Sequence, residues 1–253
     1  MRLETQRGVL GVEQHGQGEP LVLLHPFPFD RRAFLALIPH LERTRRLVTV
    51  ETRGFGESPL EGDYSIADLA DDVAAVLDAL GLPRASVLGN SMGGYVALAF
   101  ARRHASRLHR LFLCATRATA DGEAARAARD AGIAKIEQDG AAAFVAGTEA
   151  RLLGPHPSRE LRDLVKELVD HPASSLIAAL RALRDRPDRA PELGAIEHET
   201  IVIGGENDSV TPPDDVRQIA AGIRASRYFE IPDTGHLVPL EAPVQLAAIV
   251  NAY

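Results

Sequence analysis

The 253-residue chain has no tryptophan, a single cysteine and only 5% aromatic residues. With one cysteine, an intrachain disulfide and a metal site built from several thiolates are both excluded. That residue, Cys114, follows the apolar run Leu108 to Leu113, and we expect it to be a small buried hydrophobic side chain. The scarcity of aromatic side chains favours small or aliphatic ligands over large aromatic ones.

Long apolar runs and an excess of basic residues are also absent. No segment has the roughly 18 consecutive apolar residues of a membrane span, and the first seven residues lack the apolar core of a signal peptide. The net charge of −7 disfavours nucleic acid, because phosphate recognition needs a basic face. We therefore expect a cytoplasmic protein whose partner is a small-molecule substrate, and neither nucleic acid nor a membrane. A homodimer is left open.

A Gly-x-Ser-x-Gly pattern occupies residues 89–93, between a short apolar run and a helix rich in alanine and leucine. Small residues on both sides of a serine allow a strand and a helix to approach closely enough to hold it in a strained turn. The pattern predicts a nucleophile elbow with Ser91 at its apex. The alternative is a turn serine that caps a helix. A dinucleotide-binding loop fits less well, because its second glycine would be Ser91.

The rest of the chain alternates between short apolar runs and helical patterns. Ser65 and Asp68 form a capping signal before a helix that Gly81 ends. This alternation predicts a parallel sheet with helices on both faces. The expected strands are an N-terminal hairpin over 3–14 and runs at 21–24, 47–50, 85–88, 108–113, 200–203 and 227–231; the other expected helices include 31–41, 213–223 and 239–252.

Between Ala118 and Arg189 some seventy residues pass without a convincing strand. Apolar residues there recur at helical spacing, and strand signals resume afterwards. We therefore predict a helical insertion within one sheet, with residues 1–117 and 190–253 forming the core and residues 118–189 the insertion.

A serine hydroxyl needs a base, and the base needs a third group that fixes its orientation. Two loops after predicted strands supply these types: Asp208 follows the strand at Ile201, and His236 follows the strand at Tyr228. The carboxyl ends of parallel strands meet at one edge of a sheet, so both can reach Ser91. Asp208 competes with Glu206, Asp214 and Asp215, and its alternative role is a turn or helix-cap aspartate.

The other eight histidines fit catalysis less well. His25 ends a strand, but the prolines beside it favour a structural loop. The remaining seven, which stand mostly at helix or loop ends, are expected at the surface: His15, His40, His104, His109, His156, His171 and His198.

Backbone N–H groups that face a developing oxyanion are each worth about 3 kcal/mol. Met92, directly after Ser91, supplies one. The second is expected from the loop His25-Pro-Phe-Pro28, in which two residues are prolines and donate nothing, so that Phe27 is the natural candidate. Alternatively, Phe27 is a core aromatic residue.

Five segments together resemble the α/β-hydrolase family: Leu-Leu-His-Pro-Phe-Pro, Thr-Arg-Gly-Phe-Gly-Glu-Ser, Gly-Asn-Ser-Met-Gly-Gly, Gly-Glu-Asn-Asp-Ser-Val-Thr-Pro-Pro and Gly-His-Leu-Val-Pro-Leu-Glu-Ala-Pro. The resemblance implies an eight-stranded, mostly parallel sheet with a helical cap after the sixth strand. It also implies that Ser91 is the nucleophile, Asp208 the acid and His236 the base, with Phe27 and Met92 as oxyanion donors. The family's usual His-Gly is replaced here by His25-Pro26.

Within the family the chain looks most like oxoadipate enol-lactonases and small carboxylesterases. This implies a serine hydrolase, without cofactor or metal, that cleaves a carboxylic ester or lactone. We expect Phe27, Met92 and Tyr95 to bound the pocket. A substrate carboxylate would meet Arg117, Arg126 or Arg151. The alternatives are a catalytically weak ligand-binding homologue, and a lyase or cofactor-free oxidative enzyme.

Overall fold

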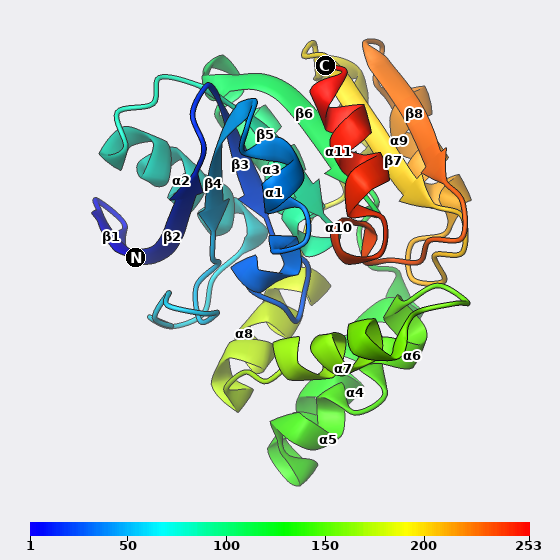
Figure 1. Ribbon diagram of the computed structural model, residues 1–253. Helices are drawn as coiled ribbons and strands as arrows, with labels where there is room; N and C mark the ends of the chain where they lie inside the picture. The colour runs from blue at the N-terminus through cyan, green and yellow to red at the C-terminus, as the bar shows by residue number, and fades with distance from the viewer.

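A computed structural model describes all 253 residues and centres on one sheet of eight strands (Figure 1). The strand order is β1-β2-β4-β3-β5-β6-β7-β8, and β2 alone runs in the direction opposite to the other seven strands. The prediction of an eight-stranded, mostly parallel sheet with an N-terminal hairpin is confirmed. The strands are β1 (Arg2–Thr5), β2 (Gly8–His15), β3 (Glu19–Leu24), β4 (Arg45–Val50), β5 (Ala85–Asn90), β6 (Leu108–Cys114), β7 (Thr200–Gly205) and β8 (Ser226–Ile231).

Both faces of the sheet are covered by helices, which explains the continuous apolar runs of its central strands. In β3, Val22 and Leu24 face the larger core cluster, whereas Leu21 and Leu23 face the second. The larger cluster lies under α2 (Ile66–Ala79), α3 (Met92–Arg103) and α9 (Pro213–Gly222), and the second lies under α1 (Ile38–Leu41) and α11 (Pro243–Asn251). The helix α2 begins with the capping box predicted from Ser65 and Asp68.

Two expected helices are interrupted by proline. The segment 31–41 forms a 3₁₀ turn, η1 (Arg31–Phe34), followed by α1, and the segment 239–252 divides into α10 (Val238–Glu241) and α11. Pro39 and Pro243 have no N–H, so a continuous α-helix through either would lose its bond to the carbonyl four residues earlier. The prediction of single helices was wrong for this reason.

Five helices lie between β6 and β7 and gather below the sheet in Figure 1. The two ends of this segment adjoin, because the Arg189 N–H donates to the Ala118 carbonyl at 2.8 Å. The expected helical cap after the sixth strand is confirmed, while the exact boundaries 117/118 and 189/190 stay a prediction. The helices are α4 (Glu123–Asp139), α5 (Ala141–Val145), α6 (Thr148–Leu152), α7 (Arg159–Leu168) and α8 (Ala173–Arg184); the 3₁₀ turns η2 (Ala105–Arg107) and η3 (Ala190–Ala195) complete the chain.

A third apolar cluster joins the cap to the core. Leu152, Val165 and Leu168 of the cap pack with Phe29 and Leu237 from the loops at the sheet edge. The cap therefore rests directly on the segments that carry the candidate site. None of the helices has the length and apolar character needed to cross a membrane.

The surface position expected for His171 was wrong. Its side chain is only 4% exposed, and its ring packs against Phe55 with the centroids 4.9 Å apart. Burial lowers the pKa of His171, although Asp30 partly opposes this. The sequence His171-Pro172 correctly indicates a break between helices, but this break lies where the cap meets the core.

Candidate active site

Ser91 stands at a sharp turn between β5 and α3, with φ at +53°. Non-glycine residues rarely adopt this region, so the turn is strained and must be held by its surroundings. A Cβ atom at position 89 would overlap the carbonyl oxygen of Gly93, and one at position 93 would overlap that of Leu24. The glycines of the pattern therefore allow α3 to pack directly on the ends of the strands.

Hydrogen bonds from the neighbouring strand hold the elbow in place. The Ser91 N–H donates to the Cys114 carbonyl at 2.9 Å, and Thr116 Oγ1 donates to the Ser91 carbonyl at 2.8 Å. The buried Asn90 amide donates to the carbonyls of Cys114 and His236, at 3.2 and 3.3 Å. The sequence analysis missed the roles of Asn90 and Thr116; their only signal was their position beside Ser91 and at the end of β6.

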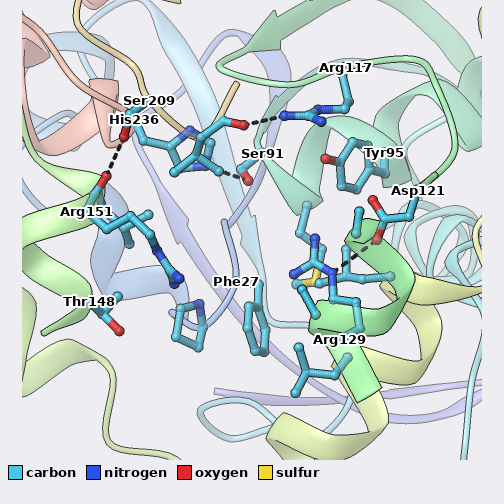
Figure 2. A pocket seen from close by; sticks show the side chains of 18 of the residues that line it. Phe27, Ser91, Tyr95, Arg117, Asp121, Arg129, Thr148, Arg151, Ser209 and His236 are labelled. Carbon is cyan, nitrogen blue, oxygen red and sulfur yellow. Dashed lines mark hydrogen bonds and ion pairs between the residues drawn. The ribbon is translucent and has the colours of Figure 1, made fainter. Parts of the chain in front are cut away.

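The structure places Ser91, His236 and Asp208 in one line of hydrogen bonds, and Figure 2 shows the first of its two contacts. His236 Nε2 lies 2.7 Å from Ser91 Oγ, and His236 Nδ1 lies 2.8 Å from Asp208 Oδ2. Since Asp208 accepts at Nδ1, the imidazole carries its proton there and Nε2 is left to accept from the serine hydroxyl. The side chains of Asp208 and His236 are 0% and 2% exposed.

Asp208 is the centre of a complete hydrogen-bond shell. Its Oδ1 accepts from the N–H groups of Val210 and Thr211, and its Oδ2 accepts from Thr211 Oγ1 at 2.6 Å as well as from His236. Burial alone would raise the pKa of Asp208, but the bonds from His236 and Thr211 outweigh it and hold that pKa below its ordinary value. The carboxylate therefore stays charged next to the imidazole.

The competing carboxylates lie elsewhere. Glu206 is exposed and accepts the Asp233 N–H, and Asp214 pairs with Arg217 on the surface. Asp215 lies 3.3 Å from Arg117. None of the three contacts His236.

His25 has the structural role that the prolines suggested. It is fully buried, its Nε2 accepts the Thr52 N–H at 3.0 Å, and its Nδ1 lies 3.0 Å from the Pro26 carbonyl. Burial lowers the pKa of His25 to about 4. The ring is therefore neutral near pH 7 and fixes the start of the loop that holds Phe27.

The two candidate oxyanion donors, Phe27 and Met92, both line the pocket beside Ser91. Met92 is the first residue of α3, so its N–H has no partner within the helix. The Phe27 N–H donates to no protein acceptor either. No residue from His25 to Phe29 has a positive φ, and the Phe27–Pro28 peptide bond is cis.

A cavity of about 310 Å³ opens above Ser91, between the sheet edge and the cap. Phe27 and Tyr95 line it as expected, and the cap contributes Phe144, Leu152 and Leu180 among others. The volume is at the small end of ligand sites.

Charged side chains on the cavity wall are mostly arginines (Figure 2). Arg117 donates to the Val210 carbonyl and pairs with Asp215, and Arg129 lies 3.1 Å from Asp121. Arg151 lines the cavity and has no ion-pair partner in the protein, whereas Arg126 is not part of the lining. The sequence analysis missed Arg129, in α4, and Asp121, just before it, because nothing in the local pattern distinguishes them from solvent-exposed charges.

Comparison with known proteins identifies the family of the chain. Residues 19–243 match the model of the alpha/beta hydrolase fold. The chain belongs to the α/β-hydrolase family.

Several relatives of this α/β hydrolase resemble it over nearly their whole length. A 3-oxoadipate enol-lactonase from Acinetobacter baylyi is 31% identical over 100% of this chain and 96% of its own. A pimeloyl-[acyl-carrier protein] methyl ester esterase from Aeromonas hydrophila is 31% identical over 96% and 98%. The structure of a thermophilic esterase from Thermogutta terrifontis, solved with malate bound, has a TM-score of 0.94 and 31% identity, covering 100% and 96%. These similarities identify this α/β hydrolase as a carboxylic ester hydrolase of the esterase or lactonase type.

The close packing at Gly89 predicts that a larger residue there lowers the free energy of unfolding. Replacing Gly89 by Ala introduces a Cβ that overlaps the Gly93 carbonyl, and overpacking of backbone against backbone costs about 3 kcal/mol. Urea unfolding should show this loss of unfolding free energy. The matched control is Gly122→Ala, where a Cβ meets nothing within 4 Å and φ is −69°, so stability should stay within about 0.5 kcal/mol of wild type. Equal stability of the two variants would contradict the account of the elbow.

Proposed function

We propose that the protein hydrolyses small carboxylic esters or lactones through an acyl-enzyme formed on Ser91. The observation that carries this proposal is the line of hydrogen bonds from Ser91 Oγ through His236 to Asp208, at a cavity that Ser91 and His236 line. Each group has a partner that suits its role: a hydroxyl facing a free imidazole nitrogen, and an imidazole N–H facing a charged carboxylate.

The first half of the proposed reaction forms the acyl-enzyme. As Ser91 Oγ attacks the substrate carbonyl, its proton moves to His236 Nε2, and Asp208 stabilises the imidazolium that results. The carbonyl oxygen becomes an oxyanion, which the N–H groups of Met92 and Phe27 are free to bind. Collapse of the tetrahedral intermediate breaks the bond to the leaving oxygen, which takes the proton from His236.

The second half releases the acid. A water molecule gives its proton to His236 Nε2 and attacks the acyl carbonyl, with the oxyanion in the same position. The bond to Ser91 Oγ breaks, and the proton returns from His236 to that oxygen. For a lactone, the leaving hydroxyl and the acid remain parts of one product molecule.

Replacing Ser91 by Ala tests this proposal directly. Because the triad acts as a unit, turnover of a para-nitrophenyl ester should fall by about 10³-fold or more, while urea unfolding stays close to wild type. Undiminished turnover in this variant would show that Ser91 is not the nucleophile. A wild-type protein that binds ester without turnover would favour the ligand-binding alternative, and turnover of other substrates without acyl transfer would favour the lyase or oxidative one.

We further propose that the substrate carries a carboxylate and that Arg151 binds it. The protein as a whole has a charge of −7, yet its cavity is lined by three arginines against one aspartate outside the catalytic line. Two arginines already have carboxylate partners, whereas the guanidinium of Arg151 extends into the cavity without one (Figure 2). The name of one similar protein contains a dicarboxylate, oxoadipate, and the structure of another was solved with the dicarboxylate malate bound.

A matched pair of esters tests this assignment. Mono-para-nitrophenyl succinate carries a carboxylate, and para-nitrophenyl pentanoate has a neutral chain of similar length. Because Arg151 is exposed, its ion pair is worth about 1 kcal/mol, so Arg151→Ala should raise KM for the succinate ester about fivefold and leave the pentanoate ester unchanged. The control Arg126→Ala removes an equal charge outside the cavity. Equal effects of the two variants would contradict a specific role for Arg151.

A further inference from the structure

The carboxylate of Glu241, in α10, accepts three backbone N–H groups from two distant parts of the chain. Its Oε1 accepts from Leu237 at 2.9 Å, and its Oε2 accepts from Gly235 at 3.0 Å and from Gly154 at 2.7 Å. Gly235 and Leu237 flank His236, whereas Gly154 belongs to the cap segment between α6 and α7. One side chain thus holds both neighbours of the candidate base and ties them to the cap.

The loop that carries His236 is packed between two layers of backbone. On the cap side, the His236 N–H donates to the Leu152 carbonyl at 2.8 Å, and a Cβ at position 235 would overlap the Gly154 nitrogen. On the sheet side, a Cβ at position 205 would overlap the Gly235 carbonyl oxygen. A shift of this loop would therefore disturb backbone contacts on both sides of His236.

Loss of the carboxylate would leave several of these N–H groups without an acceptor. Burial raises the pKa of Glu241. The three backbone N–H bonds and the nearby His236 each lower it, but they offset the effect of burial only in part. Burying a carboxylate costs free energy unless hydrogen bonds compensate it, and here three backbone N–H groups do so. Glu241 itself does not line the cavity, so it has no route to the substrate.

We propose that Glu241 is a positioning residue for His236. It holds the imidazole at hydrogen-bond distance from Ser91 Oγ, and it couples that position to the cap segment Leu152–Gly154, of which Leu152 forms part of the cavity wall. This role rests on the proposed function of His236 as the catalytic base.

Kinetics of two Glu241 variants test the role. In Glu241→Ala, kcat for a small neutral ester should fall about tenfold to a hundredfold with KM within about twofold, because a displaced base slows the chemical step more than binding. Glu241→Gln keeps the volume and one acceptor oxygen, so its kcat should lie between those of wild type and alanine.

Glu206→Ala is the matched control. Glu206 is also a carboxylate that accepts a backbone N–H of the loop before His236, but it takes a single one, from Asp233, and it is exposed. Its removal should leave kcat within about twofold of wild type.

Amide hydrogen exchange provides a readout that does not depend on activity. Exchange at Gly154 and at residues 235–237 should accelerate at least about tenfold in Glu241→Ala, while the elbow at residues 89–94 keeps its wild-type protection. Glu206→Ala should leave exchange at residues 235–237 unchanged.

The outcomes separate this proposal from the proposed function. If both Glu241 variants keep the wild-type kcat while Ser91→Ala inactivates the protein, the positioning role is overturned and the proposed function stands. The positioning role is also overturned if the activity lost in Glu241→Ala equals the fraction of that variant that is unfolded, as measured by urea titration. Retained turnover in Ser91→Ala overturns the function instead. If the alanine variant does not fold, the glutamine variant decides on the same kinetic and exchange measurements.

Discussion

The hydrogen bond between His236 Nε2 and Ser91 Oγ is the contact on which the rest of the site depends. It joins residues 145 positions apart in the chain across 2.7 Å, so small errors in either loop would break it. Ser91 lies in a strained turn, which hydrogen bonds to Cys114 and Thr116 hold in place. The histidine loop holds the other partner by contact with β7, α10 and the cap.

The charge of Asp208 determines where His236 carries its proton. Asp208 remains charged inside the protein because its two oxygens accept four hydrogen bonds, and this charge fixes which nitrogen of His236 carries the proton. The neutral His25 shows the opposite case, in which burial removes the charge from an imidazole whose partners are Thr52 and the Pro26 carbonyl. The partners of the two buried histidines differ accordingly, since His236 contacts a carboxylate, Asp208, at 2.8 Å and His25 does not.

Local patterns were sufficient to predict the sheet, the cap and the residues of the hydrogen-bonded line. The Gly-x-Ser-x-Gly turn, the apolar runs and the loops that follow them are short-range features, and parallel strands bring their carboxyl ends together whatever the loops contain. The prolines at positions 39 and 243 are equally local signals, and they mark the two helix breaks that helical spacing alone does not predict.

Contacts between distant segments could not be predicted in the same way. His171 looked like a loop residue, and only the docking of the cap buries it against Phe55. Glu241 stood within a motif, but the partners of its carboxylate include Gly154, 87 residues away. Of the three arginines considered for a carboxylate, only the fold shows that Arg126 lies outside the cavity and that Arg151 lies in it unpaired.

The most direct test of the central claim is to map the covalent adduct of a fluorophosphonate, which reacts with activated serine hydroxyls. Intact-mass and peptide mass spectrometry of the labelled wild-type protein should find one adduct per chain, on Ser91, with loss of ester turnover in proportion to labelling. An adduct on another residue, or no adduct on folded protein that still hydrolyses esters, would contradict the account.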